Sequence, residues 1–153
     1  ENEYKRWRAK RQIALHEVES PYTVLFVWDP DCGHCKKTMP ALKDFYAKFK
    51  PQGVEVFGVC TKKYDKETKL EEVEKCWQFL DENEMNQWIN VVDPFIRSRY
   101  YQKYDVTSTP RIFILDENKE ILVKGIGKEQ LEEVMDQIIK IEQEKMDKEK
   151  GKK

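Results

Sequence analysis

The sequence predicts a single α/β domain built around a mixed sheet. In the first half of the chain, short apolar runs rich in β-branched residues alternate with segments of helical periodicity, as in parallel strands joined by helices. In the second half, two such runs follow one another across a short polar loop, which indicates an antiparallel hairpin. Hydrophobic residues make up 39% of the 153 residues, enough for one core. The two halves of the sheet are therefore expected to run in different senses.

The first predicted elements form a strand–helix–strand unit. Tyr22–Trp28 is apolar on both faces, the pattern of a buried central strand. A helical pattern follows from Gly33 to Phe49, with its large apolar residues on one side. After a turn at Pro51–Gly53, the apolar run Val54–Cys60 is the second strand.

The remaining elements are three helices and a hairpin. Helical composition predicts helices over Thr68–Asn83 and Pro94–Tyr104. Arg111–Leu115 and Ile121–Lys124, separated by a polar loop, predict the hairpin. The last predicted helix, Lys128–Glu144, is long and amphipathic.

The chain divides into three segments. Residues 1–19 are expected to be an N-terminal helix (over Glu3–Val18) or linker, following an upstream region, since the chain begins with Glu1 and not with Met. Residues 20–141 form the folded domain. Residues 142–153 are almost all charged or amide-bearing and are expected to be a charged tail in which the last helix frays.

Charge and hydropathy exclude two classes of function. Charged residues make up 37% of the chain, but 28 Lys and Arg against 29 Asp and Glu leave a net charge of −1. A nucleic-acid or anionic-membrane binder would need a basic excess, so no nucleic-acid partner is expected. The longest apolar runs, such as Thr23–Trp28, are far too short to cross a bilayer.

The strongest chemical signal is the motif Cys32-Gly33-His34-Cys35, at the junction of a buried strand and a helix. A C-x-x-C motif in this context is typical of a dithiol redox site. Free N–H groups and the dipole at a helix N-terminus stabilise a thiolate, which is the reactive form of cysteine. Cys32 is therefore expected to attack, and Cys35 to resolve the mixed disulfide. Gly33 and His34 are expected to tune the thiolate.

A C-x-x-C motif can also be half of a zinc site, which needs two further ligands. The other candidates are His16, His34, Cys60 and Cys76, and none forms a second closely spaced pair, so no metal site is predicted. Cys60 and Cys76 themselves could form a structural disulfide, a second redox relay, or two buried free thiols. We favour two free thiols, because nothing in the sequence defines their geometry.

The segment Trp28–Pro40 resembles the active-site segment of the thioredoxin superfamily. The chain most resembles thiol–disulfide oxidoreductases of Bacteroidetes cell envelopes, in the branch that includes the ResA- and TlpA-type proteins. Thr107–Pro110 resembles the cis-proline loop of the superfamily, and the hairpin over residues 112–125 resembles its terminal hairpin. The resemblance spans roughly residues 20–140. It implies a thioredoxin-like fold, with a central four- to five-stranded mixed sheet flanked by helices and a helical insert after the second strand.

The resemblance also implies roles for individual residues. Cys32 would be the nucleophile and Cys35 the resolving cysteine. Pro110 would be cis and shape a substrate groove in which the backbone of Thr109 meets an extended peptide. Trp28, four residues before Cys32, is expected to line the same groove.

Three residues bear on the chemistry of this dithiol. Phe26 and Thr38 stand where members of the superfamily carry a buried acid that moves the proton of the resolving cysteine. His34 makes the motif Cys-Gly-His-Cys, which resembles that of protein disulfide isomerase. A stabilised thiolate makes such a pair more oxidising.

These observations predict a thiol–disulfide oxidoreductase of the protein-disulfide reductase or isomerase type, acting without a cofactor beyond its redox-active cysteines. Its partners would be protein thiols and disulfides and, from the resemblance, a membrane-anchored thiol reductase or oxidase. We expect a monomer in the periplasm or cell envelope. Two alternatives remain. One is a metal- or partner-binding module without enzymatic activity. The other is a thiol peroxidase. The sequence argues against it, because Asp29 stands where a peroxidatic site needs a threonine.

Overall fold

The computed structural model describes residues 13–151 and contains one five-stranded sheet. Its strands, in the order β3-β2-β1-β4-β5, are β1 (Tyr22–Trp28), β2 (Val54–Cys60), β3 (Ile89–Val92), β4 (Arg111–Leu115) and β5 (Ile121–Lys124). β1, β2 and β3 pair in parallel, whereas β4 pairs antiparallel with both β1 and β5. The mixed sheet predicted from the sequence is thus confirmed.

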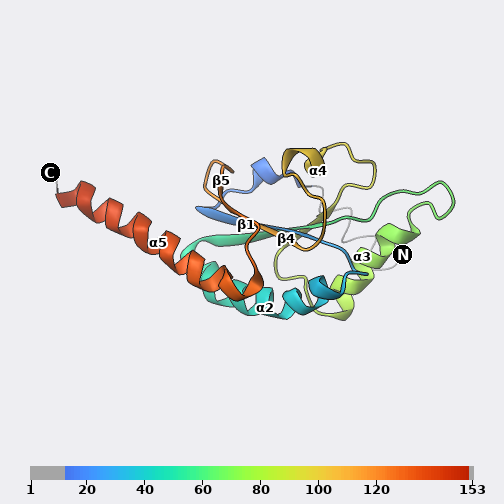
Figure 1. Cartoon of the computed structure of the whole chain (residues 1–153), viewed down its shortest axis with the longest axis horizontal. Helices are drawn as coiled ribbons and strands as arrows, with labels where there is room; N and C mark the ends of the chain where they lie inside the picture. The colour runs from blue at the N-terminus through green and yellow to red at the C-terminus, as the bar shows by residue number, and fades with distance from the viewer. Residues whose placement is uncertain (1–12, 152–153) are drawn as a thin grey trace.

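Helices cover both faces of the sheet (Figure 1). One face packs against α2 (Gly33–Phe49), α3 (Glu71–Glu82) and α5 (Lys128–Gly151). The other face packs against the short helix α4 (Tyr100–Lys103) and the 3-10 turn η1 (Leu15–Glu17). A second 3-10 turn, η2 (Lys50–Gln52), joins α2 to β2. Two hydrophobic layers therefore enclose the sheet.

β1 is buried on both faces because its side chains alternate between the two layers. Phe26 and Trp28 belong to the layer beneath α2, and Leu25 and Val27 belong to the layer beneath α4. This burial fixes the end of β1, and with it the start of the turn that leads into α2.

Strand β3 was not predicted, because a polar residue stands in its middle. Asn90 is buried, and its amide group donates hydrogen bonds to the carbonyl oxygens of Met85 and Trp88 at 3.1 and 3.2 Å. On the neighbouring strand, Gly58 leaves room for it: a Cβ there would lie 2.7 Å from the Asn90 Oδ1. Asn90 thus fits the core through contacts that a hydrophobic pattern does not reveal.

The helix predicted over residues 94–104 is wrong except for its last turn, α4. The carboxylate of Asp93 accepts hydrogen bonds from the backbone N–H groups of Arg97 and Ser98 and from the Ser98 hydroxyl. Arg99 has a left-handed backbone with φ of 53°. This side-chain-capped loop replaces helical hydrogen bonds until residue 100.

The predicted ends of several elements also change. Of the helix predicted over residues 3–18, residues 3–12 lie outside the described part, and the rest contains only the turn η1. α3 begins at Glu71 rather than Thr68. α5 continues to Gly151, so the described part of the predicted tail is an exposed helix. Within residues 13–151, no helix is both long and apolar enough to cross a bilayer.

Candidate active site

Cys32 occupies the N-cap position of α2, where β1 turns into the helix. The N-cap has an extended backbone, and its Sγ accepts a hydrogen bond from the backbone N–H of Cys35 at 3.1 Å. That N–H is one of the donors that a helix start leaves without an internal partner. The sulfur of Cys32 therefore lies at the positive end of the helix dipole.

The two thiols of the motif differ in their surroundings. Cys32 is partly exposed, Cys35 is only 1% exposed, and both are free. Burial raises the pKa of Cys32, but hydrogen bonds with Cys35, Thr109 and the backbone of His34 outweigh it, so the net shift is downward. Burial, reinforced by the hydrogen bond with Cys32, raises the pKa of Cys35 to about 12. Only Cys32 is therefore suited to react as a thiolate near neutral pH.

The loop before β4 meets the motif from the other side. The peptide bond between Thr109 and Pro110 is cis, as the resemblance implied. The Cys32 thiol lies 3.6 Å from the carbonyl oxygen of Thr109, to which it donates. The fold thus brings together the nucleophile and a loop 77 residues away in the chain.

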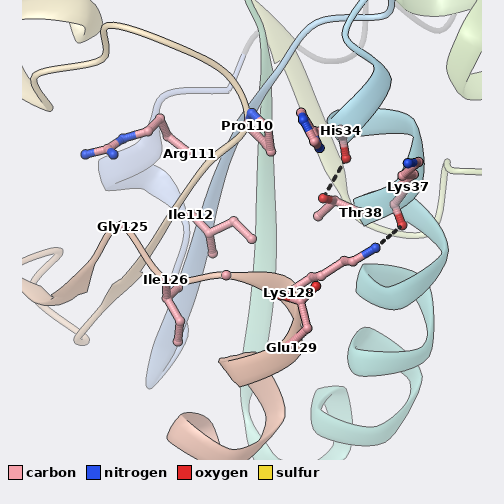
Figure 2. A pocket seen from close by; sticks show the side chains of 11 residues that line it. His34, Lys37, Thr38, Pro110, Arg111, Ile112, Gly125, Ile126, Lys128 and Glu129 are labelled. Carbon is pink, nitrogen blue, oxygen red and sulfur yellow. Dashed lines mark hydrogen bonds between the residues drawn. The ribbon is translucent and has the colours of Figure 1, made fainter.

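A groove of about 310 Å³ lies beside the motif (Figure 2). Its walls come from the start of α2, the start of β4 and the loop between β5 and α5; they include His34, Lys37, Thr38, Pro110, Arg111, Ile112, Ile126, Lys128 and Glu129. The Nζ of Lys128 reaches across to donate to the carbonyl oxygen of Lys37 at 3.5 Å. Arg111 points away from the α2 wall. An open groove beside the motif with the partly exposed Cys32 can accept an extended polypeptide.

The prediction that Trp28 lines this groove is wrong. Its side chain is 1% exposed and packs against Phe79 with ring centroids 5.4 Å apart. Trp28 ends a central strand with its side chain in the layer beneath α2 and α3, so it supports the site from behind.

Neither residue at the positions of the superfamily's acids can act as one. Phe26 is buried in the core, and the buried Thr38 donates its hydroxyl hydrogen to the carbonyl oxygen of His34 at 2.8 Å. His34 lowers the pKa of Cys32 through a hydrogen bond from its backbone. A Cβ at Gly33 would meet nothing within 4 Å. Tuning by the ring of His34 and by Gly33 stays a prediction.

Cys60 and Cys76 form a disulfide, which corrects the expectation of two free thiols. Cys60 ends β2 and Cys76 lies in α3, and their Cα atoms are 6.3 Å apart, within the range that a disulfide spans. Both residues are at most 1% exposed. The pair is therefore shielded from other proteins, unlike Cys32.

Sequence analysis missed Lys62, whose ammonium group lies near the active-site turn. Its Nζ is 2.7 Å from a carboxylate oxygen of Asp31 and 3.4 Å from one of Asp29. Lysines after a strand carry no motif, so only the fold reveals this contact. Within the described residues, no group of three or more His, Cys, Asp or Glu side chains is placed to hold a metal ion.

Comparison with known proteins identifies relatives of this arrangement. The family model described as Thioredoxin-like matches residues 20–121. A domain of a possible thiol-disulfide isomerase from Cytophaga hutchinsonii is 31% identical over 84% of this chain and 82% of its own, with a TM-score of 0.71.

Two further solved structures share the fold. The thioredoxin domain of a thiol-disulfide oxidoreductase from Bacteroides vulgatus is 20% identical over 83% of this chain and 85% of its own, with a TM-score of 0.71. A thiol:disulfide interchange protein from Bacteroides sp. is 22% identical over 84% of this chain and 79% of its own, with a TM-score of 0.68. No curated protein matches the chain.

Proposed function

Because this chain belongs to the thioredoxin-like family, we propose that it is a thiol–disulfide oxidoreductase that exchanges disulfides with proteins through Cys32 and Cys35. One observation carries the proposal: the two thiols are unequal. Cys32 is partly exposed, with a lowered pKa, whereas Cys35 is buried, with a pKa raised to about 12. Exchange needs this division between an attacking thiolate and a protected resolving thiol.

In the proposed reduction, the Cys32 thiolate attacks one sulfur of a substrate disulfide. The substrate S–S bond breaks, its other sulfur leaves as a thiolate, and a mixed disulfide forms with Cys32. Cys35 then loses its proton and attacks the Sγ of Cys32, which releases the second substrate thiolate. The substrate has gained two electrons, and Cys32 and Cys35 are joined by a disulfide. The reverse sequence oxidises a substrate dithiol.

The proton of Cys35 goes to water in this proposal. Phe26 and Thr38 carry no carboxyl group, so neither can accept it. The high pKa of Cys35 keeps the resolving thiol protonated until the mixed disulfide forms. At that stage Cys32 no longer carries the thiolate that opposes ionisation of Cys35.

The substrate would lie in the groove between α2 and the cis-proline loop. The carbonyl of Thr109 lies beside the Cys32 sulfur, and its loop offers backbone groups to an extended peptide. The groove presents both charged side chains and apolar surface, including Lys37, Glu129 and Ile112. We propose protein thiols and disulfides as substrates and no cofactor beyond the two cysteines.

The disulfide between Cys60 and Cys76 supports an oxidising compartment, since such bonds are rare in the reducing cytosol. We therefore propose that the protein acts in the periplasm or cell envelope, and we propose separately that it is a monomer. There it would exchange electrons with another thiol protein, such as a membrane-anchored reductase or oxidase.

The experiment that tests the function is a redox titration of Cys32 and Cys35. The protein is equilibrated in glutathione and dithiothreitol buffers, and its free thiols are trapped and counted by mass spectrometry. A midpoint near about −270 mV assigns a reductant, and one of roughly −120 to −180 mV assigns an oxidase or isomerase. A Cys32–Cys35 pair that never forms a disulfide would overturn the proposed function.

A further inference from the structure

The turn that precedes Cys32 is held by the segment that follows β2. The backbone N–H of Thr61 donates to the carbonyl oxygen of Trp28 at 2.9 Å, which extends the pairing of β1 and β2 beyond their ends. The Thr61 hydroxyl donates to the Oδ2 of Asp29 at 2.9 Å. The active-site turn is thus attached to its neighbour by backbone and side-chain contacts.

Lys62, the next residue, places a positive charge beside the same turn. Its side chain is only 16% exposed, and its Nζ lies 2.7 Å from Asp31 Oδ2 and 3.4 Å from Asp29 Oδ1. A third carboxylate, that of Glu72 at the start of α3, lies 3.5 Å away and also pairs with Lys75 at 2.9 Å. Asp29 is also little exposed, at 23%, so solvent screens that pair weakly, whereas the carboxylate of Asp31 is 62% exposed and is screened more strongly.

Asp29 links Lys62 to the nucleophile. Its carbonyl oxygen accepts the backbone N–H of Cys32 at 3.1 Å, and its Oδ1 accepts the backbone N–H of Asp31 at 2.8 Å. The oxygen that Lys62 contacts therefore belongs to the hydrogen-bonded turn that places Cys32 at the start of α2. Movement of Asp29 would move Cys32 as well.

Lys62 also bears on the charge balance near Cys32. Asp29 and Asp31 bring two negative charges within three residues of Cys32, and negative charge disfavours a thiolate. The ammonium of Lys62 offsets them where the turn and the start of α3 meet. On the α2 side, Lys36 offers a further positive charge toward Asp31.

From these contacts we propose that Lys62 is a positioning residue for thiol–disulfide exchange: it holds the Asp29–Asp31 turn and offsets part of the negative charge of its carboxylates, so that the Cys32 thiolate remains stabilised. This inference rests on the proposed function. The Cys60–Cys76 disulfide supports it, because it ties the strand end that leads to Lys62 to the helix that carries Glu72.

The test compares the full chain with Lys62→Met and measures the rate of iodoacetamide alkylation of Cys32 against pH. We expect the pKa of Cys32 to rise by about half a unit, as for unit charges in a largely aqueous surrounding. Because a less stable thiolate disfavours the reduced pair, the equilibrium constant with glutathione should move about threefold toward a stronger reductant.

Three further variants separate charge from structure. Lys62→Arg keeps the charge and should stay close to the parent protein. Lys62→Met with Asp31→Asn removes one charge of each sign and should recover most of the shift. The matched control is Lys48→Met, because Lys48 also pairs with more than one carboxylate, those of Glu132 and Asp136, but near the far end of α2.

A Cys32 pKa that is equal in Lys62→Met, Lys48→Met and the parent protein would overturn the inference. A shift that Asp31→Asn fails to recover would do so as well, because it would mean a loss of structure only. Alkylation needs no disulfide substrate. A chain with a normal alkylation profile but no exchange would therefore refute the proposed function separately.

Discussion

The molecule contains two cysteine pairs that experience opposite surroundings. Cys32 and Cys35 begin a helix and are free, and one of the two sulfurs is partly exposed. Cys60 and Cys76 join a strand end to the middle of another helix and are fully buried. The first pair has helix N–H donors and a groove beside it, whereas the second is enclosed by hydrophobic side chains.

This difference teaches that exposure and local donors, not the presence of two cysteines, decide which pair can exchange. A buried disulfide has no path for an attacking thiolate. A partly exposed thiol at a helix start has both access and a stabilised charge. The first pair is therefore assigned to chemistry and the second to stability, and the following experiments test that division.

The largest effect is expected from Cys32→Ser. Removal of the nucleophile should lower disulfide exchange with a model protein substrate by at least about 1,000-fold, because hydroxyl oxygen does not attack disulfides. Cys35→Ser should instead accumulate a mixed disulfide at Cys32, visible by mass spectrometry. If mixed disulfides formed at Cys35 in the Cys32→Ser chain as fast as they form at Cys32 in the Cys35→Ser chain, the assigned roles would be wrong.

The second effect is the selectivity of alkylation within the first pair. The pKa of Cys32 lies below its ordinary value of 9.0 and that of Cys35 is raised to about 12. At pH 7, the thiolate fraction of Cys32 should therefore exceed that of Cys35 by at least about 1,000-fold, since each pKa unit changes that fraction tenfold, and Cys32 should be alkylated much faster. Its rate should rise with pH through a midpoint below pH 9, which peptide mass spectrometry after iodoacetamide can follow. Equal labelling of both cysteines would contradict the structure.

The third effect concerns stability. Replacing Cys60 and Cys76 together by alanine should lower the free energy of unfolding by about 3 kcal/mol, because it releases a cross-link that closes a 16-residue span. Urea unfolding followed by circular dichroism measures it. The matched control is Cys32→Ala with Cys35→Ala in the reduced chain, where no bond is lost and the cost should be roughly 1 kcal/mol. If both double variants lost the same free energy of unfolding, the Cys60–Cys76 pair would have no special role in stability.

The smallest effect is expected at His34. His34→Ala should change the pKa of Cys32 by less than about half a unit, because the contact that lowers that pKa comes from the backbone of His34. His34→Pro removes the N–H at a position where helices tolerate proline, so it should raise the pKa more. The ultraviolet absorbance of the thiolate against pH measures both. A larger shift in the alanine variant would assign the tuning to the imidazole ring.

The strands with continuous apolar patterns could be predicted from the sequence to the residue, as for β1 and β2. Their burial on both faces demands the pattern that predicts them. β3 was not predicted because Asn90 is buried through hydrogen bonds to the carbonyls of Met85 and Trp88, which an apolar pattern cannot indicate. The loop capped by Asp93 was not predicted for the same reason: hydrogen bonds to a side chain replace the backbone hydrogen bonds of a helix.

The site divides in the same way. Cys32 and Cys35 could be predicted because their chemistry needs only local spacing and a helix start. The partner of Cys60 and the contacts of Lys62 could not, since both depend on how α3 packs against the end of β2. Trp28 was misplaced because its nearness to Cys32 in the sequence says nothing about the face of the sheet to which it points.

Because the Cys60–Cys76 disulfide is buried, its rate of reduction can report local unfolding of α3. While the native packing is intact, a small thiol reagent cannot reach either sulfur, so reduction must wait until α3 separates from the sheet. When reclosing is faster than attack, the reduction rate is proportional to the population of that open form. Each condition that shifts the local unfolding equilibrium of α3 would then be reported by this bond.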